Sequence, residues 1–530
     1  MIHGAMQPYS LTLDKFLDHA AKWHPDAKVV TARENGPATG VGYADLRRRA
    51  GRISTVLAGL GIELGDHVAT LAWNTQAHVE AWYAIMGMGA VCHTLNPRLT
   101  AAQIASMLAQ SKARVLIISA DLHALASQIA ERATAIQHVL VIDGSTQGWR
   151  LGGASPGVTA LEAEIEAATG EAEWGQFDEN SPSGLCFTSG TTGAPKGVSY
   201  THRSSFLHTL RLLQADVLAL RASDAVMPVV PMFHASAWGL PFAVPAVGAK
   251  LVLPGRQADG ASLAKLIAAE GVTIAVGVPT VWVGLIDHLE KTGGELPSLE
   301  RIIVGGAPMP PALMARIEER LGVTIQTSWG MTELSPSGTF APPADPDRKA
   351  SVSGRPAIGV DLLLADASGQ PLAEQRGAEG YLKVRGAAVV ERYFGFDEAS
   401  TDEDGWFDTG DLARIDARGN LTITGRAKDL IKSGGEWINP SEIEAVIGAL
   451  PQVSLAAVIG RADPKWGERP VLLVELREPE AVTDDELLKP LQGRVAPWWI
   501  PDAVVRLSKM PLASTGKIDK MRLREIYGGI

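Results

Sequence analysis

Residues 187–197 read FTSGTTGAPKG, and the interpretation of the whole chain depends on this stretch. It follows a short apolar run that ends at Phe187, so we expect a loop at the end of a buried strand. Its three glycines let backbone N–H groups turn toward one point, its hydroxyls add donors, and Lys196 adds a positive charge. These groups are typical of a loop that binds phosphates. A Walker A loop is excluded because glycine follows the lysine. Composition alone leaves a flexible linker equally open.

The composition predicts a soluble cytoplasmic protein. The chain has 530 residues and a formal charge of −11, with 48 basic and 59 acidic side chains, so neither nucleic acid nor a membrane surface is an expected partner. Its only two cysteines, Cys92 and Cys186, exclude a disulfide framework. The beginning, MIHGAMQPYS, lacks the apolar segment of a signal peptide. The longest apolar stretch, 238–248, is too short to cross a bilayer, so we expect no integral membrane association.

Alternating patterns along the chain predict an α/β protein. Helical patterns such as 43–62 alternate with strand-like runs such as 67–73, which indicates βαβ units and buried parallel sheets. After about residue 355 the strands become short and are separated by Gly/Asp turns, which favours antiparallel sheet. We therefore predict a large N-terminal domain with parallel-rich sheets and a small β-barrel-like subdomain, followed by a smaller, mobile α+β domain. The predicted domains are 1–427 and 428–530, the second with a helix over 484–496.

Two other motifs were weighed and set aside. GASPG at 153–157 matches the serine-hydrolase elbow, but Pro156 has no N–H for the oxyanion contact that the elbow supplies. The twelve histidines show no zinc-binding spacing. Both patterns are better explained as ordinary structure.

The order of five motifs decides between phosphate loop and linker. The opening stretch resembles the phosphate loop of the adenylate-forming superfamily, which includes acyl-CoA synthetases, luciferases and peptide-synthetase adenylation domains. Four further motifs of that superfamily follow in its order: WGMTE (329–333), GWFDTGD (405–411), GRAKDLIKSGGEWI (425–438) and PLASTGKIDK (511–520). The resemblance spans nearly the whole chain, and five ordered motifs are far more specific than one.

This resemblance implies an ATP site with Mg²⁺. The β- and γ-phosphates would be bound by the loop, through Thr188, Ser189, Gly190, Thr191, Thr192, Gly193 and Lys196. Glu333 would ligate Mg²⁺, with Thr188 also near the metal, and Thr332 would lie beside the α-phosphate. Trp329, where the family most often has tyrosine, would stack on adenine, and Asp411 would accept both ribose hydroxyls. The other implied nucleotide contacts are Gly306, Ala307, Pro308, Gly330, Met331, Arg426 and Lys432.

The same resemblance implies two half-reactions that share one C-terminal domain. Lys517 would be the catalytic lysine of adenylation, because an ammonium can offset the repulsion between a carboxylate and the α-phosphate. Lys428 and Asp429 would form a hinge. Rotation about it would withdraw Lys517 and bring the coenzyme A gate to the acyl channel. The gate residues are Ser433, Gly434, Gly435, Glu436 and Trp437.

The acyl pocket points to an apolar acid. The stretches 231–241 and 276–282 should line it, with His234 near the reacting carboxyl group, and neither offers a charge for a second polar group. The predicted pocket residues are His234, Trp238, Val276, Gly277, Gly305 and Trp437. PMFHASAWGLP, GVPTVW and IKSGGEWI look most like the fatty acyl-CoA ligases that include the methylmercaptopropionate–CoA ligases. In that subgroup the tryptophan matching Trp437 is thought to gate the acyl tunnel.

The function predicted from these residues is ATP-dependent formation of an acyl-CoA through an acyl-adenylate. The expected acid is a medium-chain fatty acid or 3-methylmercaptopropionate, and aryl or cinnamoyl acids remain alternatives. A stand-alone enzyme that loads a carrier protein, and an oxidising luciferase, would share every motif. A non-catalytic nucleotide-binding regulator would be expected to lack Lys517 or Glu333, and both are present. A homodimer is expected from related ligases.

Overall fold

A seven-stranded sheet carries the predicted phosphate loop. The computed structural model describes residues 5–152, 156–188, 195–477, 482–513 and 516–529. In spatial order the sheet consists of β7 (Gly157–Ala160), β6 (His138–Ile142), β5 (Val115–Ser119), β3 (His67–Leu71), β4 (Val91–Thr94), β8 (Pro182–Phe187) and β9 (Gly197–Thr201). Its strands are parallel except for the antiparallel β8–β9 pair, in which Phe187 faces Gly197. The predicted phosphate loop therefore connects β8 to β9.

A second, nine-stranded sheet supplies most of the other motif positions. In spatial order it contains β16 (Arg355–Pro356), β15 (Ser337–Phe340), β14 (Thr324–Gly330), β13 (Arg301–Val304), β12 (Ile274–Gly277), β10 (Ala225–Pro228), β11 (Lys250–Leu253), β1 (Lys28–Thr31) and β2 (Thr39–Gly42). The six strands from β14 to β1 are parallel, and antiparallel pairs extend the sheet at both edges. The carboxyl ends of parallel strands, where ligands of α/β proteins commonly bind, thus bring 277, 305 and 330 to one edge.

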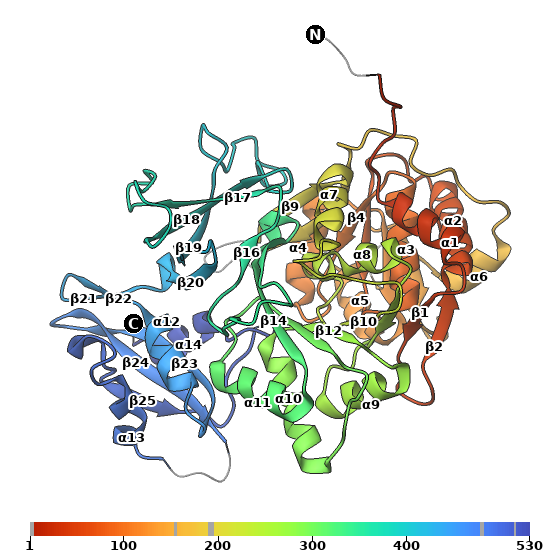
Figure 1. Cartoon of the computed structure of the whole chain (residues 1–530). Coiled ribbons are helices and arrows are strands. Elements are labelled where there is room, and N and C mark those ends of the chain that lie inside the picture. Colours follow the sequence, from red (N-terminus) through yellow and green to blue (C-terminus); the bar gives the residue numbers. More distant parts are fainter. Residues whose placement is uncertain (1–4, 153–155, 189–194, 478–481, 514–515, 530) are drawn as a thin grey trace.

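Helices fill and cover the space around the two large sheets (Figure 1). They are α1 (Asp14–Trp23), α2 (Tyr43–Gly59), α3 (Gln76–Gly87), α4 (Ala101–Ser111), α5 (His123–Ala130), α6 (Leu161–Ala167), α7 (His202–Leu212), α8 (Leu240–Ala246), α9 (Gly260–Glu270), α10 (Pro279–Thr292) and α11 (Pro311–Leu321). The largest core joins side chains of both sheets to α3 and α8, including Trp82, Phe242 and Val226. Helix α3 is buried over most of its length, in keeping with its apolar run from Ala81 to Met86.

The antiparallel part of the chain forms a four-stranded sheet. Its strands are β17 (Val360–Ala365), β18 (Glu379–Gly386), β19 (Phe407–Ile415) and β20 (Leu421–Arg426), paired in that order. This is the subdomain predicted to be barrel-like; in the described residues its end strands β17 and β20 are not paired with each other. The predicted boundary at 427/428 falls in the turn Ala427–Asp429 that follows β20.

The C-terminal unit is a smaller α+β domain (Figure 1, blue). It contains β21 (Ile431–Ser433), β22 (Glu436–Ile438), β23 (Val453–Asp463), β24 (Gly467–Leu476), β25 (Ala503–Arg506), α12 (Pro440–Gly448), α13 (Asp484–Leu488) and α14 (Lys520–Tyr527). The helix predicted over 484–496 is wrong in length: α13 ends at Leu488 and continues only as a 3₁₀ turn to Leu491. Pro490 explains the stop, because it lacks the N–H that a longer helix would need.

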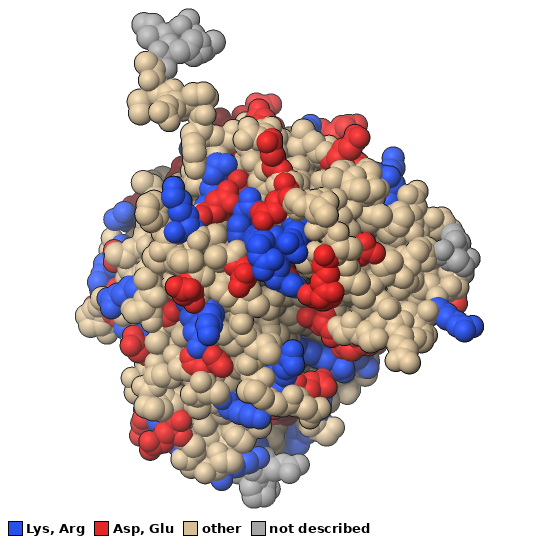
Figure 2. Space-filling view, turned by 90° about the vertical axis from the view of Figure 1, so that its right-hand side faces the viewer, with Lys and Arg blue, Asp and Glu red and all other residues tan. Residues whose placement is uncertain are grey.

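The fold class predicted from the sequence, α/β with parallel-rich sheets and a separate C-terminal domain, is confirmed. Within the described ranges, every helix is too short or too polar to cross a bilayer. Basic and acidic side chains are intermingled on the face shown in Figure 2, so the charge of −11 does not form one acidic patch on that face.

Candidate functional site

The base of the phosphate loop is closed by the β8–β9 hairpin. The Thr188 N–H donates to the Lys196 carbonyl at 2.9 Å, directly after the last strand pair. The Lys196 ammonium lies 4.7 Å from the centroid of the Tyr393 ring. Five predicted phosphate contacts lie outside the described residues: Ser189, Gly190, Thr191, Thr192 and Gly193. Of the loop, the structure therefore places its two ends and its lysine.

The WGMTE motif turns sharply at the end of β14. Thr332 and Glu333 lie in a 3₁₀ turn and are both buried. The Tyr200 hydroxyl donates to the Thr332 carbonyl at 2.8 Å, which joins this turn to β9 and hence to the phosphate loop. The Tyr393 hydroxyl donates to Glu333 Oε1 at 2.9 Å. Burial, assisted by the Glu333 charge, raises the pKa of Tyr393 above its usual range, so its hydroxyl remains a donor at neutral pH.

Glu333 has the chemistry that a magnesium ion requires. Mg²⁺ is commonly held by one or two carboxylates while substrate phosphates and waters supply the remaining oxygens. In the described part of the chain, no three His, Cys, Asp or Glu side chains cluster as a metal site. One buried carboxylate with an oriented oxygen therefore fits an ion bound jointly with a nucleotide, rather than an all-protein metal site.

Asp411 lies buried at the bend of β19, between two donors from different motifs. The Trp329 indole N–H donates to its Oδ2 at 2.8 Å, and Arg426 Nε lies 2.6 Å from its Oδ1. Apart from this ion pair with Arg426, Oδ1 is a buried acceptor with no hydrogen bond within the described structure. Burial raises the pKa of Asp411, while the Arg426 charge and the Trp329 hydrogen bond lower it. An acceptor with this unfilled capacity suits a ligand hydroxyl, as a ribose would provide.

Lys517 reaches this group from the C-terminal domain. Its Cε lies 3.5 Å from where a β-carbon on Gly306 would stand, and Gly306 has a φ of +76° that favours glycine. The preceding Gly516 carbonyl accepts a hydrogen bond from Thr280 Oγ1 at 3.0 Å. Burial, followed by the Arg426 charge, lowers the pKa of Lys517 to about 8, although Asp411 and Glu333 act in the opposite direction. Lys517 thus lies against Gly306, and the charges of Asp411 and Glu333 act on it from two other parts of the sequence.

The predicted acyl wall has an unusual backbone. Four consecutive residues, 235–238, have φ between 44° and 55°, and Trp238 packs against the turn that follows β13. Its ring lies 3.0 Å from the position of a β-carbon on Gly305. His234 precedes this turn; burial, with Lys517 contributing, lowers its pKa to about 4, so the ring is neutral at pH 7. Left-handed backbone costs energy in non-glycine residues and is characteristic of functional sites.

Other acyl-pocket and adenine-turn residues lie at the ends of neighbouring strands. Val276 and Gly277 end β12. A β-carbon on Gly277 would lie only 2.8 Å from the Trp282 ring, so glycine is needed for this packing. Ala307 and Pro308 lie in the turn between β13 and α11, and Gly330 and Met331 follow β14. These ends converge on the same sheet edge as Trp238.

The predicted gate residues are not part of this group. Trp437, on the edge strand β22, is 54% exposed, and the Lys432 ammonium lies 5.5 Å from the centroid of its ring. Ser433 accepts a hydrogen bond from Arg469 Nη1 at 3.2 Å, and Gly434 packs on Trp466. Gly435 and Glu436 are exposed in the same hairpin. In the predicted hinge, Asp429 pairs with Arg524 at 2.7 Å, and burial lowers the pKa of Lys428.

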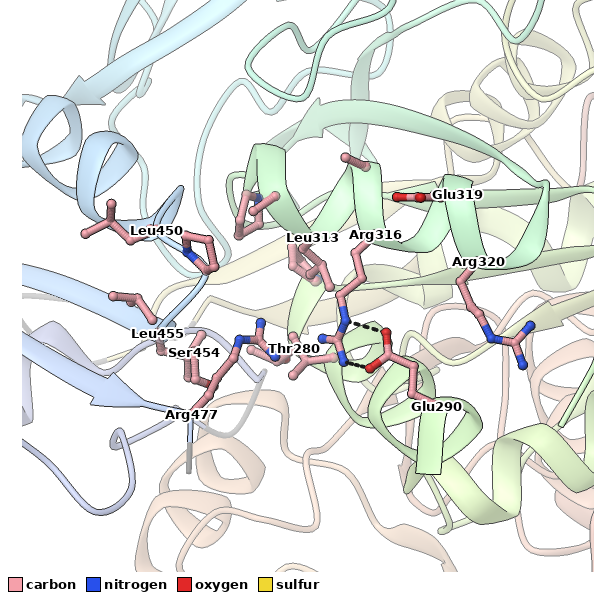
Figure 3. Close-up of a pocket in the computed structure, with 18 residues that line it drawn as sticks. Thr280, Glu290, Leu313, Arg316, Glu319, Arg320, Leu450, Ser454, Leu455 and Arg477 are labelled. Atoms are coloured by element: carbon pink, nitrogen blue, oxygen red, sulfur yellow. Dashed lines mark hydrogen bonds and ion pairs between the residues drawn. The ribbon is translucent and has the colours of Figure 1, made fainter. Parts of the chain in front are cut away.

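A separate cleft of about 760 Å³ lies between the two domains (Figure 3). It is lined by residues of α10 and α11 on one side and of the C-terminal domain on the other, including Thr280, Arg316, Leu450 and Arg477. Arg477 lies 3.6 Å from Asp287, which joins the domains, and Arg316 pairs with Glu290. Thr280 lines this cleft, but within the described structure none of the predicted nucleotide, acyl-pocket or gate residues does. The cleft is therefore distinct from the Lys517 group.

Comparison with known proteins defines the class. Residues 17–394 match the family model "AMP-binding enzyme", and residues 442–517 match "AMP-binding enzyme C-terminal domain". The chain belongs to this family, which confirms the resemblance to the adenylate-forming superfamily.

Individual relatives refine the comparison. A 3-methylmercaptopropionyl-CoA ligase of Ruegeria lacuscaerulensis is 41% identical over 99% of this chain and 98% of that protein. A medium-chain-fatty-acid–CoA ligase of Ectopseudomonas oleovorans is also 41% identical, over 99% and 98%. Among solved structures, ATP-bound MatB from Rhodopseudomonas palustris is 25% identical with a TM-score of 0.85, covering 98% of this chain and 99% of that one.

Two residues of the site were missed in the sequence. Tyr393 lies in a loop without a recognised motif, yet it contacts both Lys196 and Glu333. Asn74 is buried and holds the segment before the acyl wall: it donates to the Pro228 and Val230 carbonyls and accepts from the Met232 N–H. Their partners are 60 or more positions away, and no local pattern predicts such contacts.

Proposed function

We propose that this chain is an ATP-dependent acid–thiol ligase that forms an acyl-CoA through an acyl-adenylate. The observation that supports the proposal is the position of Lys517 against Gly306, where the charges of Asp411 and Glu333 also act on it, since this puts a cation near groups suited to a nucleotide. The predicted reaction class is confirmed by relatives that are CoA ligases and that match over almost the full length of the chain. The acid itself is part of the proposal.

The first half-reaction follows from the charges around Lys517. A carboxylate oxygen of the acid attacks the α-phosphorus of ATP, the bond to the bridging oxygen breaks, and pyrophosphate leaves. Lys517 would offset the repulsion between carboxylate and phosphate and stabilise the charge on the five-coordinate phosphorus. Asp411 would hold the ribose and Lys196 the outer phosphates. Mg²⁺, when bound by Glu333, neutralises phosphate charge.

The second half-reaction would use the other face of the C-terminal domain. The sulfur of coenzyme A attacks the carbonyl carbon of the adenylate, the mixed anhydride bond breaks, and AMP leaves. Since residues 433–437 lie outside the Lys517 group, we propose that the domain rotates about Lys428 and Asp429 between the steps. The position of Lys517 against Gly306 supports the proposal that this orientation serves adenylation.

The pocket favours an apolar acid. His234 is neutral and Trp238 lines the wall, and no charge among the predicted pocket residues would bind a second polar group. Medium-chain fatty acids and 3-methylmercaptopropionate are therefore the proposed substrates, in agreement with the names of two relatives that are each 41% identical to this chain. We also propose a cytoplasmic location and a homodimer, the latter supported only by the resemblance to related ligases.

The test is ATP–pyrophosphate exchange across acids from C3 to C16, with 3-methylmercaptopropionate and cinnamate. Each acid is then assayed for AMP release with coenzyme A. Acid-dependent exchange followed by thiol-dependent AMP release would support the proposal and rank the acids by rate. Exchange without thiol-dependent turnover would indicate a carrier-protein acceptor. No exchange with any acid would refute adenylation.

A further inference from the structure

Tyr393 contacts three elements of the nucleotide site although it belongs to none of their motifs. It lies in the loop between β18 and β19 and is half-buried. Its hydroxyl donates to Glu333 Oε1 at 2.9 Å, and its ring lies 4.7 Å from the Lys196 ammonium. Its ring also packs edge-on against Phe407, with centroids 6.4 Å apart. Phe407 begins β19, the strand that carries Asp411.

The backbone around Tyr393 is fixed to the same two motifs. The Val390 N–H donates to the Glu333 carbonyl at 2.8 Å, and the Phe394 N–H donates to the Gly197 carbonyl at 2.7 Å. A β-carbon on Gly197 would lie 3.0 Å from Phe394 Cβ, so glycine permits this close approach. The tyrosine is therefore held between the phosphate loop and the Glu333 turn by bonds on both sides of it.

These contacts restrict two flexible charged groups. A glutamate carboxylate can rotate, and a donor on Oε1 fixes its plane while leaving lone pairs free for a metal ion. A lysine has four rotatable bonds, and the face of an aromatic ring attracts its ammonium. One side chain thus orients both the acidic group suited to Mg²⁺ and the basic group suited to phosphate.

We propose that Tyr393 is a positioning residue, which orients Glu333 for Mg²⁺ through its hydroxyl and Lys196 for the ATP phosphates through its ring. The inference rests on the proposed function. Two variants separate the role of the hydroxyl from that of the ring. Tyr393→Phe keeps the ring and loses the hydroxyl donor, whereas Tyr393→Leu loses both.

The experiment measures ATP binding by titration calorimetry, without acid, in excess Mg²⁺ and in EDTA. For Tyr393→Phe we expect about tenfold weaker binding in Mg²⁺, the lower end for loss of a group that orients a metal ligand, and a change of less than about twofold in EDTA. For Tyr393→Leu we expect a further loss of about two- to fivefold in both conditions, because the cation–π contact is also lost. Tyr381→Phe, on the adjacent strand β18, is the matched control and should behave as wild type.

A double-mutant cycle shows whether the hydroxyl acts through Glu333. In a Glu333→Gln background, Tyr393→Phe should no longer change the Mg²⁺ dependence of ATP binding. Equal effects in both backgrounds, or wild-type binding by Tyr393→Phe, would overturn the role of the hydroxyl. Identical binding by the Phe and Leu variants would overturn the role of the ring. Circular dichroism and thermal unfolding would verify that each variant is folded.

The outcome is independent of the proposed reaction. If wild type binds MgATP and Tyr393→Phe weakens that binding, the positioning role stands even when no acid supports pyrophosphate exchange. If wild type catalyses exchange and Tyr393→Phe binds MgATP normally, the positioning role fails and the proposed function stands.

Discussion

Replacement of Trp329 by phenylalanine tests the link between the residues proposed to bind adenine and ribose, Trp329 and Asp411. The change keeps an aromatic ring but removes the indole N–H that donates to Asp411 Oδ2 at 2.8 Å. A hydrogen bond to a charged, buried group contributes about 1.5–3 kcal/mol, and about 1.4 kcal/mol corresponds to a factor of ten. If nucleotide binding depends on the orientation of Asp411, the KM for ATP should rise about 10- to 100-fold.

The assay is acid-dependent pyrophosphate exchange with ATP, 2′-deoxy-ATP and 3′-deoxy-ATP. Wild type should prefer ATP, because each analogue lacks one hydroxyl that Asp411 would accept. In Trp329→Phe the preference should shrink, since the carboxylate is no longer held in one plane. The low-pH limb of kcat/KM should also move to higher pH, because the Trp329 hydrogen bond lowers the pKa of Asp411 and its loss raises that pKa.

Trp282→Phe is the control for this prediction. Trp282 is also buried, but its indole N–H has no hydrogen bond within the described structure, so its replacement removes ring volume alone. It should leave the ratio of ATP to deoxy-ATP unchanged. An unchanged ATP preference and KM in Trp329→Phe would refute the idea that Trp329 orients Asp411.

Three further predictions concern Lys517 and Gly306, the turn residue that it contacts. Lys517→Ala should lower the rate of adenylation about 10²- to 10³-fold while leaving thioester formation from a synthetic acyl-adenylate within about threefold, and equal loss in both assays would contradict its assignment to the first step. Since burial lowers the pKa of Lys517 to about 8, kcat/KM for exchange should fall above pH 8. As the pH rises from 8 to 10.5, Lys517 should make the fold more stable, because over this range the unfolded chain still binds the Lys517 proton while the folded chain has lost it. If activity falls only where the protein unfolds, the assignment of the pH dependence to Lys517 is refuted. Gly306→Ala should lower exchange about tenfold, because a β-carbon at φ +76° strains the backbone of the turn that Lys517 Cε contacts, and wild-type exchange would show that this turn tolerates the strain.

The sequence predicted those parts of the fold and site that depend on local patterns. Helical periodicity over 43–62 predicted α2, and the strand-like run 67–73 predicted β3, because burial leaves a regular pattern in the sequence. The motif residues are contiguous, so their chemistry could be interpreted before any contact was known. The error over 484–496 has a local cause as well: Pro490 is visible in the sequence, and it ends the helix.

Contacts between distant segments could not be predicted in this way. Trp329 and Asp411 are 82 positions apart. The prediction that Trp329 stacks on adenine gave no indication that its indole N–H donates to the Asp411 carboxylate. Tyr393 has an unremarkable local sequence, and its role follows only from the packing of its loop between β9 and the Glu333 turn. The left-handed residues 235–238 contain no glycine that would have signalled them.

The interface between the domains is consistent with a C-terminal unit that changes orientation. Its polar contacts include the Thr280–Gly516 hydrogen bond at 3.0 Å and the partly exposed Arg477–Asp287 pair at 3.6 Å. Exposed ion pairs contribute about 0–1 kcal/mol, and a cleft of about 760 Å³ lies between the two domains. Breaking these contacts therefore costs little compared with the differential binding of ATP and coenzyme A that would be available to drive rotation. If the C-terminal unit turns as one body about the proposed hinge, Lys517 and the exposed Trp437 would occupy the site alternately, since a rotation that brings one in would carry the other out.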